Sequence, residues 1–163
     1  MATIKLQPSG KVVIKDGKVA CECCLGFQMT ILYSWEGTGQ PDLDTSTRGF
    51  DENLGYSCTN QEIYLQWITG DDTSIDGNEQ VDARVDDARK DGLWTSSYNI
   101  ECFAGWYGGA GGSGPAELIV TYKNKTKQKT IYPGQQNSCA ATLIATITVY
   151  AQKQPDDSFF EIL

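Results

Sequence analysis

Histidine is absent from this chain of 163 residues, and its absence removes several functions at once. Histidine is the usual general base near neutral pH and the commonest metal ligand in proteins. Any metal site here must therefore use oxygen ligands, which suit hard cations, or thiolates, which suit zinc. A cysteine nucleophile is disfavoured because no imidazole can activate it, and no other catalytic set is evident. We therefore expect a protein that is not an enzyme.

Long apolar runs are also missing, and basic residues are scarce. The N-terminal segment has no apolar stretch of signal-peptide length, and no run approaches the roughly 20 residues of a membrane span. Lys and Arg number 13 against 21 Asp and Glu, which gives a net charge of −8. An acidic chain repels phosphate, so neither nucleic acid nor an anionic membrane is an expected partner. We expect cytoplasmic synthesis without a signal peptide, with release as part of a particle as the alternative.

Short alternating segments dominate what the sequence does contain. Alternation of apolar and polar residues is the pattern of a half-buried β-strand. Asp16-Gly17, between two such runs, predicts a tight hairpin turn. Only residues 85–92 could hold a helical turn, which Gly92 would end. Strands are expected at residues 27–35, 62–68, 80–85, 98–107, 116–122, 127–132 and 141–152.

These elements predict a single all-β domain over residues 1–163, an antiparallel β-sandwich of jelly-roll or Greek-key type. A hairpin-rich segment, residues 1–24, would pack on the sandwich or extend it. The Gly-rich stretch 107–115 is expected to be a loop between two strands. Lysine at every second position over residues 123–129 predicts an edge hairpin with a charged solvent face, which discourages aggregation. A patch for an acidic partner is the alternative for these lysines.

Residues 70–79, GDDTSIDGNE, concentrate negative charge between two apolar runs. Asp72, Ser74 and Asp76 stand at alternate positions and Gly77 follows, which is the opening spacing of an EF-hand calcium loop. Ala83 stands where that loop needs its bidentate Glu, and no helices flank the segment. The segment is therefore not an EF-hand, although it is still a candidate calcium loop on a β scaffold.

A second acidic segment precedes this one in the chain. Asp42 and Asp44 are two residues apart in an extended stretch, so their carboxylates should share one face while Leu43 is anchored in the core. Two like charges side by side are unfavourable without a cation. We expect Ca²⁺ to join the two segments, while Mg²⁺ is a weaker candidate and a solvated acidic loop is the alternative. The expected ligands are Asp42, Asp44, Asp71, Asp72, Asp76 and Glu79.

The segments WEGTGQPDLDTS and GDDTSIDGNEQV together resemble the TerD-type family of tellurium-resistance and stress proteins. The resemblance lies within residues 31–120 and is limited to the DLD and GDD…DG…E motifs. The chain departs from the family pattern at Asp72, where the family has Asn, and in its reduced DGNE group. The CECC segment and the last strand have no counterpart. The resemblance implies a calcium-binding β-sandwich, and its motifs carry over to Asp42, Asp44, Asp71, Asp76 and Glu79.

Six cysteines leave three interpretations open. The CECC segment has the spacing of half a zinc site, but no second pair follows it, which makes Zn²⁺ an unlikely cofactor. Disulfides need an oxidising setting, although the even count and two polar turns are compatible with them. Reduced, buried thiols are the third interpretation, and Cys102 is expected in the core. The residues open to a disulfide or to zinc are Cys21, Cys23, Cys24, Cys58 and Cys139.

The expected function is structural or recognitional, with a protein partner or self-assembly. One alternative is a structural subunit of a phage-like or other self-assembling particle without metal. The other is a calcium-dependent carbohydrate-binding module, in which Trp94 or Trp106 would be exposed to a sugar.

Overall fold

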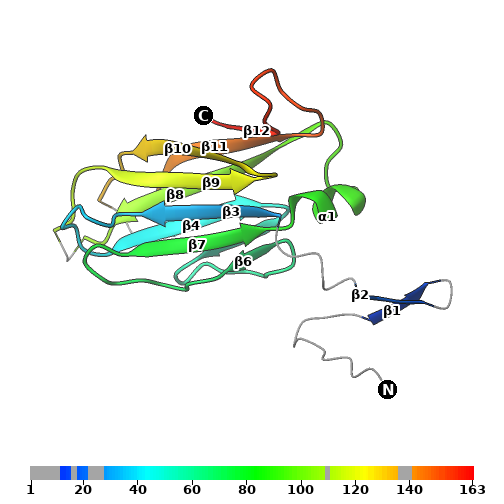
Figure 1. Ribbon diagram of the computed structural model, residues 1–163. Helices are drawn as coiled ribbons and strands as arrows, with labels where there is room; N and C mark the ends of the chain where they lie inside the picture. The colour runs from blue at the N-terminus through cyan, green and yellow to red at the C-terminus, as the bar shows by residue number, and fades with distance from the viewer. Residues whose placement is uncertain (1–11, 16–17, 22–27, 109–110, 136–140) are drawn as a thin grey trace.

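The computed structural model describes residues 12–15, 18–21, 28–108, 111–135 and 141–163, and β-strands dominate it (Figure 1). Two five-stranded sheets face each other across one core. All pairings between their strands are antiparallel. The prediction of an all-β antiparallel sandwich is therefore confirmed.

The two sheets are built from alternate parts of the chain. In spatial order, the first sheet contains β10 (Lys125–Ile131), β9 (Ala116–Tyr122), β3 (Met29–Ser34), β7 (Asn78–Ala83) and β6 (Leu65–Trp67). The second sheet contains β12 (Phe160–Ile162), β11 (Thr142–Tyr150), β8 (Ser97–Trp106), β4 (Leu43–Gly49) and β5 (Glu52–Gly55). The short helix α1 (Val85–Lys90) follows β7, where a helical turn was expected. Within the described part of the chain, no helix has the length and apolar character needed to cross a membrane.

Nearer the N-terminus, β1 (Val12–Lys15) and β2 (Lys18–Cys21) form a separate two-stranded sheet. Their register pairs Lys15 with Lys18, in agreement with the hairpin expected around Asp16-Gly17. Residues 16–17 themselves, and the stretches 1–11 and 22–27, lie outside the described residues. How the segment 1–24 relates to the sandwich therefore stays a prediction.

The alternating pattern of the sequence places the core. In β3, Met29, Ile31 and Tyr33 are fully buried while the residues between them are partly exposed. Cys102, on β8, is buried as expected and lies opposite Tyr33. Burial raises the pKa of the Cys102 thiol to about 12, because the thiolate cannot be hydrated there. This thiol is therefore a core group rather than a reactive one.

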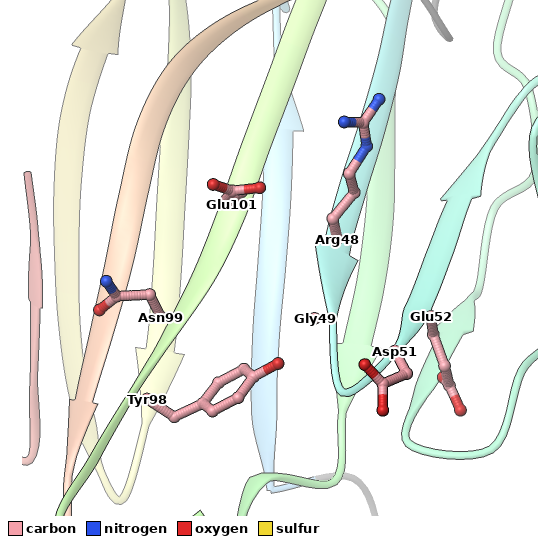
Figure 2. Close-up of a pocket in the computed structure, with 7 residues that line it drawn as sticks. All are labelled: Arg48, Gly49, Asp51, Glu52, Tyr98, Asn99 and Glu101. Carbon is pink, nitrogen blue, oxygen red and sulfur yellow. The ribbon is translucent and has the colours of Figure 1, made fainter.

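Strand β6 is shorter than the strand expected at residues 62–68, and the backbone at its start bonds to Glu52. The side chain of Glu52, at the start of β5, is buried and accepts the backbone N–H groups of Ile63, Tyr64 and Leu65 at 2.7–3.0 Å. A carboxylate of the second sheet thus accepts backbone N–H groups at the edge of the first sheet, where a neighbouring strand would otherwise bond. Figure 2 shows Glu52 on β5 at the margin of a surface pocket.

The lysine-rich strand β10 is an edge of the first sheet, as the sequence predicted. The prediction that its lysines form the solvent face is wrong, because they share the partly buried face with Ile131 and the residues between them are the exposed ones. Lys127 Nζ lies 2.6 Å from Asp156 Oδ2, and Lys125 Nζ lies 3.8 Å from Asp157 Oδ2. Both acids belong to the connection between β11 and β12. The edge lysines are thus partly engaged with acids of the same chain.

Candidate metal centre

Connections between strands gather at one end of the sandwich, on the left of Figure 1. They are the β3–β4 and β6–β7 connections, together with the described parts of the β8–β9 and β10–β11 connections. The first two connections carry or adjoin all six acids that the sequence singled out. The fold therefore brings the DLD segment and the GDDTSIDGNE segment to the same end of the molecule.

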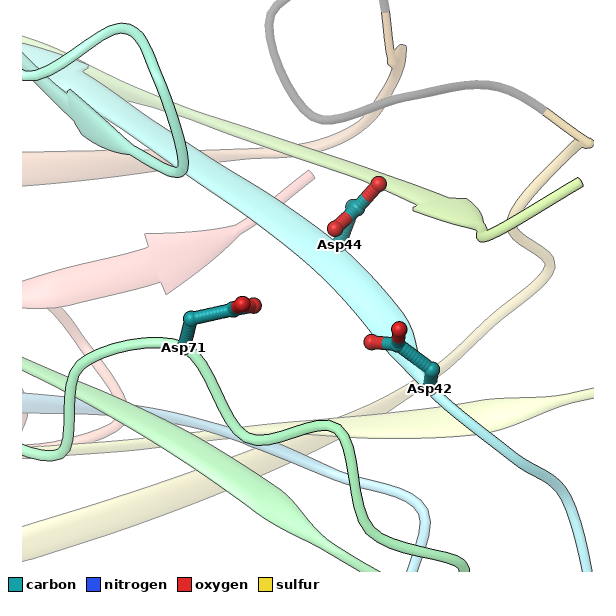
Figure 3. A group of neighbouring side chains, drawn as sticks. All are labelled: Asp42, Asp44 and Asp71. Atoms are coloured by element: carbon teal, nitrogen blue, oxygen red, sulfur yellow. The ribbon is translucent and has the colours of Figure 1, made fainter. Parts of the chain in front are cut away.

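Three of the six acids, Asp42, Asp44 and Asp71, converge there (Figure 3). Each supplies a carboxylate oxygen, and the three oxygens lie within 4.8 Å of one another. Leu43 is fully buried between the first two, as the extended spacing predicted. Asp44 is buried, Asp42 is partly buried and Asp71 is exposed, so the group is reached from solvent at Asp71.

Three negative charges so close together are unfavourable in this group. Burial raises the pKa of Asp42, and the neighbouring carboxylates of Asp71 and Asp72 raise it further. Asp42 Oδ1 is a buried atom with no hydrogen-bond partner among the described residues. Such an oxygen is costly to leave unsatisfied, and a cation between the three carboxylates would satisfy it.

Asp72 and Asp76 lie outside the group of three and shape the connection between β6 and β7. Asp72 accepts the backbone N–H of Ser74 at 3.0 Å and that of Asn78 at 2.9 Å. Burial opposes ionisation of Asp72, but the hydrogen bond from the Ser74 side chain and these two N–H groups outweigh it and lower the pKa of Asp72. Asp76 adopts a left-handed φ of 57° and accepts the backbone N–H of Gly39. The residues whose spacing resembles an EF-hand opening thus supply hydrogen bonds of the turn, and metal binding by Asp72 and Asp76 stays a prediction.

Glu79 is the sixth expected ligand, and it also lies outside the group of three. It is fully buried on β7, where it accepts the backbone N–H of Asp72 at 3.1 Å and the hydroxyl of Thr45. Burial raises the pKa of Glu79 to about 8; the two hydrogen bonds oppose this rise, and the charges of Asp71 and Asp44 add to it. Direct metal binding by Glu79 stays a prediction.

Sequence reasoning missed the groups that connect these segments. The main-chain oxygen of Gln40 accepts the N–H of Asp76 at 3.1 Å, and its side-chain oxygen accepts the N–H of Ser113 at 2.9 Å. The indole N–H of Trp35 donates to the main-chain oxygen of Ser74 at 3.0 Å. No sequence pattern marks Gln40 for this role, since it depends on where distant backbone groups lie.

Gly77→Ala is expected to lower the free energy of unfolding by about 1–3 kcal/mol through overpacking. A β-carbon there would lie 2.6 Å from Asp72 Oδ2 and 2.6 Å from Trp35 Cζ2, so the loop must shift. Urea unfolding measures the loss. Gly108→Ala is the matched control, because its β-carbon would meet nothing within 4 Å. Equal stabilities of the two variants would contradict the crowding at Gly77.

Trp94 and Trp106 do not form a ligand-binding surface, and that prediction is wrong. Their side chains are 5% and 1% exposed. The indole N–H of Trp94 donates to the main-chain oxygen of Val85 at 2.9 Å, and that of Trp106 to Gly114 at 3.2 Å. Helix α1 and the Gly-rich loop thus satisfy these two rings, and Gly112 packs directly against Trp106.

The structure describes only part of the cysteine set. Cys58 lies in a turn after β5, as its polar surroundings predicted. The backbone of Cys21 ends β2. Cys23, Cys24 and Cys139 lie outside the described residues. The zinc and disulfide interpretations therefore stay predictions.

A second candidate site is an open pocket of about 290 Å³ on the outer face of the second sheet (Figure 2). Its main polar groups are used in packing: the Arg48 guanidinium lies 4.2 Å from the Phe103 ring centre, and the Tyr98 hydroxyl accepts the Phe50 N–H at 2.6 Å. The predicted site residues lie elsewhere. The pocket is lined by Arg48, Gly49, Asp51, Glu52, Tyr98, Asn99 and Glu101.

Comparisons with protein-family models, with curated protein sequences and with solved structures found no match. The resemblance to the TerD-type family is therefore supported by its two sequence motifs alone. What the structure adds is a β-sandwich with a group of three acidic residues that could hold a metal ion.

Proposed function

We propose that this protein binds a calcium ion through Asp42, Asp44 and Asp71, and that the ion joins two connections at one end of a non-enzymatic β-sandwich. The observation that carries the proposal is the convergence of three carboxylates from two chain segments within 4.8 Å. Calcium lies about 2.3–2.6 Å from its oxygen ligands, so two ligands of one ion are at most about 5 Å apart. The observed spacing therefore suits a shared ion.

The chemistry of the group favours calcium over other cations. All three side chains offer carboxylate oxygens, which suit hard cations and not the soft-ligand sites of zinc. Calcium accepts six to eight oxygens in flexible geometry, so water and main-chain oxygens can complete its shell. Magnesium requires a near-ideal octahedron and keeps most of its waters. The TerD-type resemblance, which implies calcium, supports the same choice.

The proposed role is structural or recognitional. The ion would hold the β3–β4 and β6–β7 connections together and so present the loops at this end of the sandwich in one arrangement. A protein partner, self-assembly into a particle and a carbohydrate ligand remain predictions.

Calcium is expected to stabilise the folded protein against heat. At a free concentration one hundred times the dissociation constant, ligand linkage gives about 2.7 kcal/mol of added stability. For a domain of this size, that corresponds to a rise in Tm of about 5–11 °C. Thermal unfolding in CaCl₂ and in EDTA measures the difference.

The double variant Asp42→Asn/Asp71→Asn should lose this calcium response, since two of the three anionic ligands are neutralised. Asp51→Asn is the matched control: Asp51 is an exposed acid in the turn between β4 and β5, outside the acidic group. It should keep the full response. A wild-type Tm that is equal in CaCl₂ and in EDTA would contradict the proposed function.

A further inference from the structure

Glu79 and Thr45 connect the two ligand-bearing segments inside the core. Glu79 Oε1 accepts the N–H of Asp72 at 3.1 Å, and Glu79 Oε2 accepts the hydroxyl of Thr45. Asp72 directly follows the ligand Asp71, and Thr45 directly follows the ligand Asp44. One buried carboxylate is therefore bonded to the residue next to a ligand on each side of the site.

This connection also joins the two sheets. Glu79 belongs to β7 in the first sheet and Thr45 to β4 in the second, and both side chains are buried. Side-chain atoms in a packed core have few alternative positions, so the two hydrogen bonds restrict how far Asp71 and Asp44 can separate.

We infer that Glu79 and Thr45 are positioning residues of the calcium site, which hold Asp71 and Asp44 at the spacing that the ion requires before it binds. The inference rests on the proposed function and assigns these two residues a role that needs no contact with the ion. Groups behind metal ligands fix ligand orientation, and their loss commonly weakens metal binding by about 10–100-fold. Without the connection, the ion itself would have to order the two segments, and its affinity would fall.

Thr45→Val tests the inference without changing any charge. The variant keeps the shape of the side chain and removes the hydroxyl that Glu79 accepts. Isothermal titration of the folded protein with CaCl₂ should give a Kd raised about tenfold or more. Thr45→Ser restores a hydroxyl and should bring the Kd back to within about threefold of wild type, because the hydrogen bond to Glu79 can form again.

Thr47→Val is the matched control on the same strand. Thr47 is fully buried, and its hydroxyl lies 2.7 Å from the hydroxyl of Tyr33, so this hydrogen bond does not involve Glu79. Both valine variants lose a buried hydrogen bond and some stability. Only Thr45→Val should lose calcium affinity, so a merely structural role would move both variants alike.

The outcomes distinguish the positioning role of Thr45 and Glu79 from calcium binding itself. A wild type that binds Ca²⁺, together with equal Kd values for Thr45→Val and Thr47→Val, overturns the positioning role and leaves the proposed function intact. A wild type that takes up no Ca²⁺ overturns both. A selective loss in Thr45→Val that Thr45→Ser repairs supports the inference.

Discussion

Glu52→Ala is expected to lower the free energy of unfolding by about 3–5 kcal/mol, because it removes the charged acceptor of three backbone donors, one of them on buried Leu65. The carboxylate of Glu52 accepts the N–H groups of Ile63, Tyr64 and Leu65, and the side chain is only 3% exposed. Hydrogen bonds to a charged acceptor contribute more than neutral ones. Urea unfolding followed by tryptophan fluorescence measures the loss.

Glu62→Ala is the control for this experiment, because Glu62 also accepts a backbone N–H of β6, that of Trp67 at 3.2 Å, but is exposed to water. It should cost less than about 1 kcal/mol, as exposed groups exchange one hydrogen bond for another with water. Hydrogen exchange at the Leu65 amide should accelerate in Glu52→Ala and not in Glu62→Ala. Similar losses in the two variants would contradict the bridging role of Glu52.

The strands that could be predicted are those whose two faces differ in polarity. Strand β3 alternates over its six residues and β8 over most of its ten, and their patterns place Ile31 and Cys102 in the core. Strands β5 and β12 span four and three residues, which is too short for alternation to stand out. Strand β4 is polar in sequence and yet mostly buried. The Thr47 hydroxyl, for example, bonds to Tyr33 in the core, and polar composition does not predict such burial.

Part of the candidate site could also be predicted, and charge was the useful signal. Repulsion between neighbouring acids indicated that Asp42 and Asp44 need a cation, and the fold places a third acid, Asp71, beside them. The hydrogen bonds of Asp72 could not be predicted, because they depend on backbone N–H groups that only the folded turn brings near. The exposure expected for Trp106 was wrong, because alternation gives the period of a strand and not what covers it.

Glu79→Gln should change how the stability of the metal-free protein depends on pH. Burial raises the pKa of Glu79 from 4.5 to about 8 in the folded state, with the charges of Asp71 and Asp44 adding to the rise. The folded protein therefore keeps a proton on Glu79 that the unfolded chain releases near pH 4.5. Wherever the unfolded state binds fewer protons, stability falls as pH rises, so the wild type should lose stability between pH 4.5 and about 8.

A shift of this size corresponds to about 3–5 kcal/mol at the upper end of that range, at about 1.4 kcal/mol for each pH unit. Glutamine cannot ionise, and it can still accept from Asp72 through its oxygen and donate to Thr45 through its amide. Urea unfolding in EDTA at several pH values from 5 to 8 should therefore show that the stability of Glu79→Gln rises relative to that of the wild type as the pH rises. Glu101→Gln, an exposed substitution on β8, should follow the wild type. Parallel pH profiles for the wild type and Glu79→Gln would mean that Glu79 ionises in the folded protein without penalty, and the electrostatic account of this end of the sandwich would then be wrong.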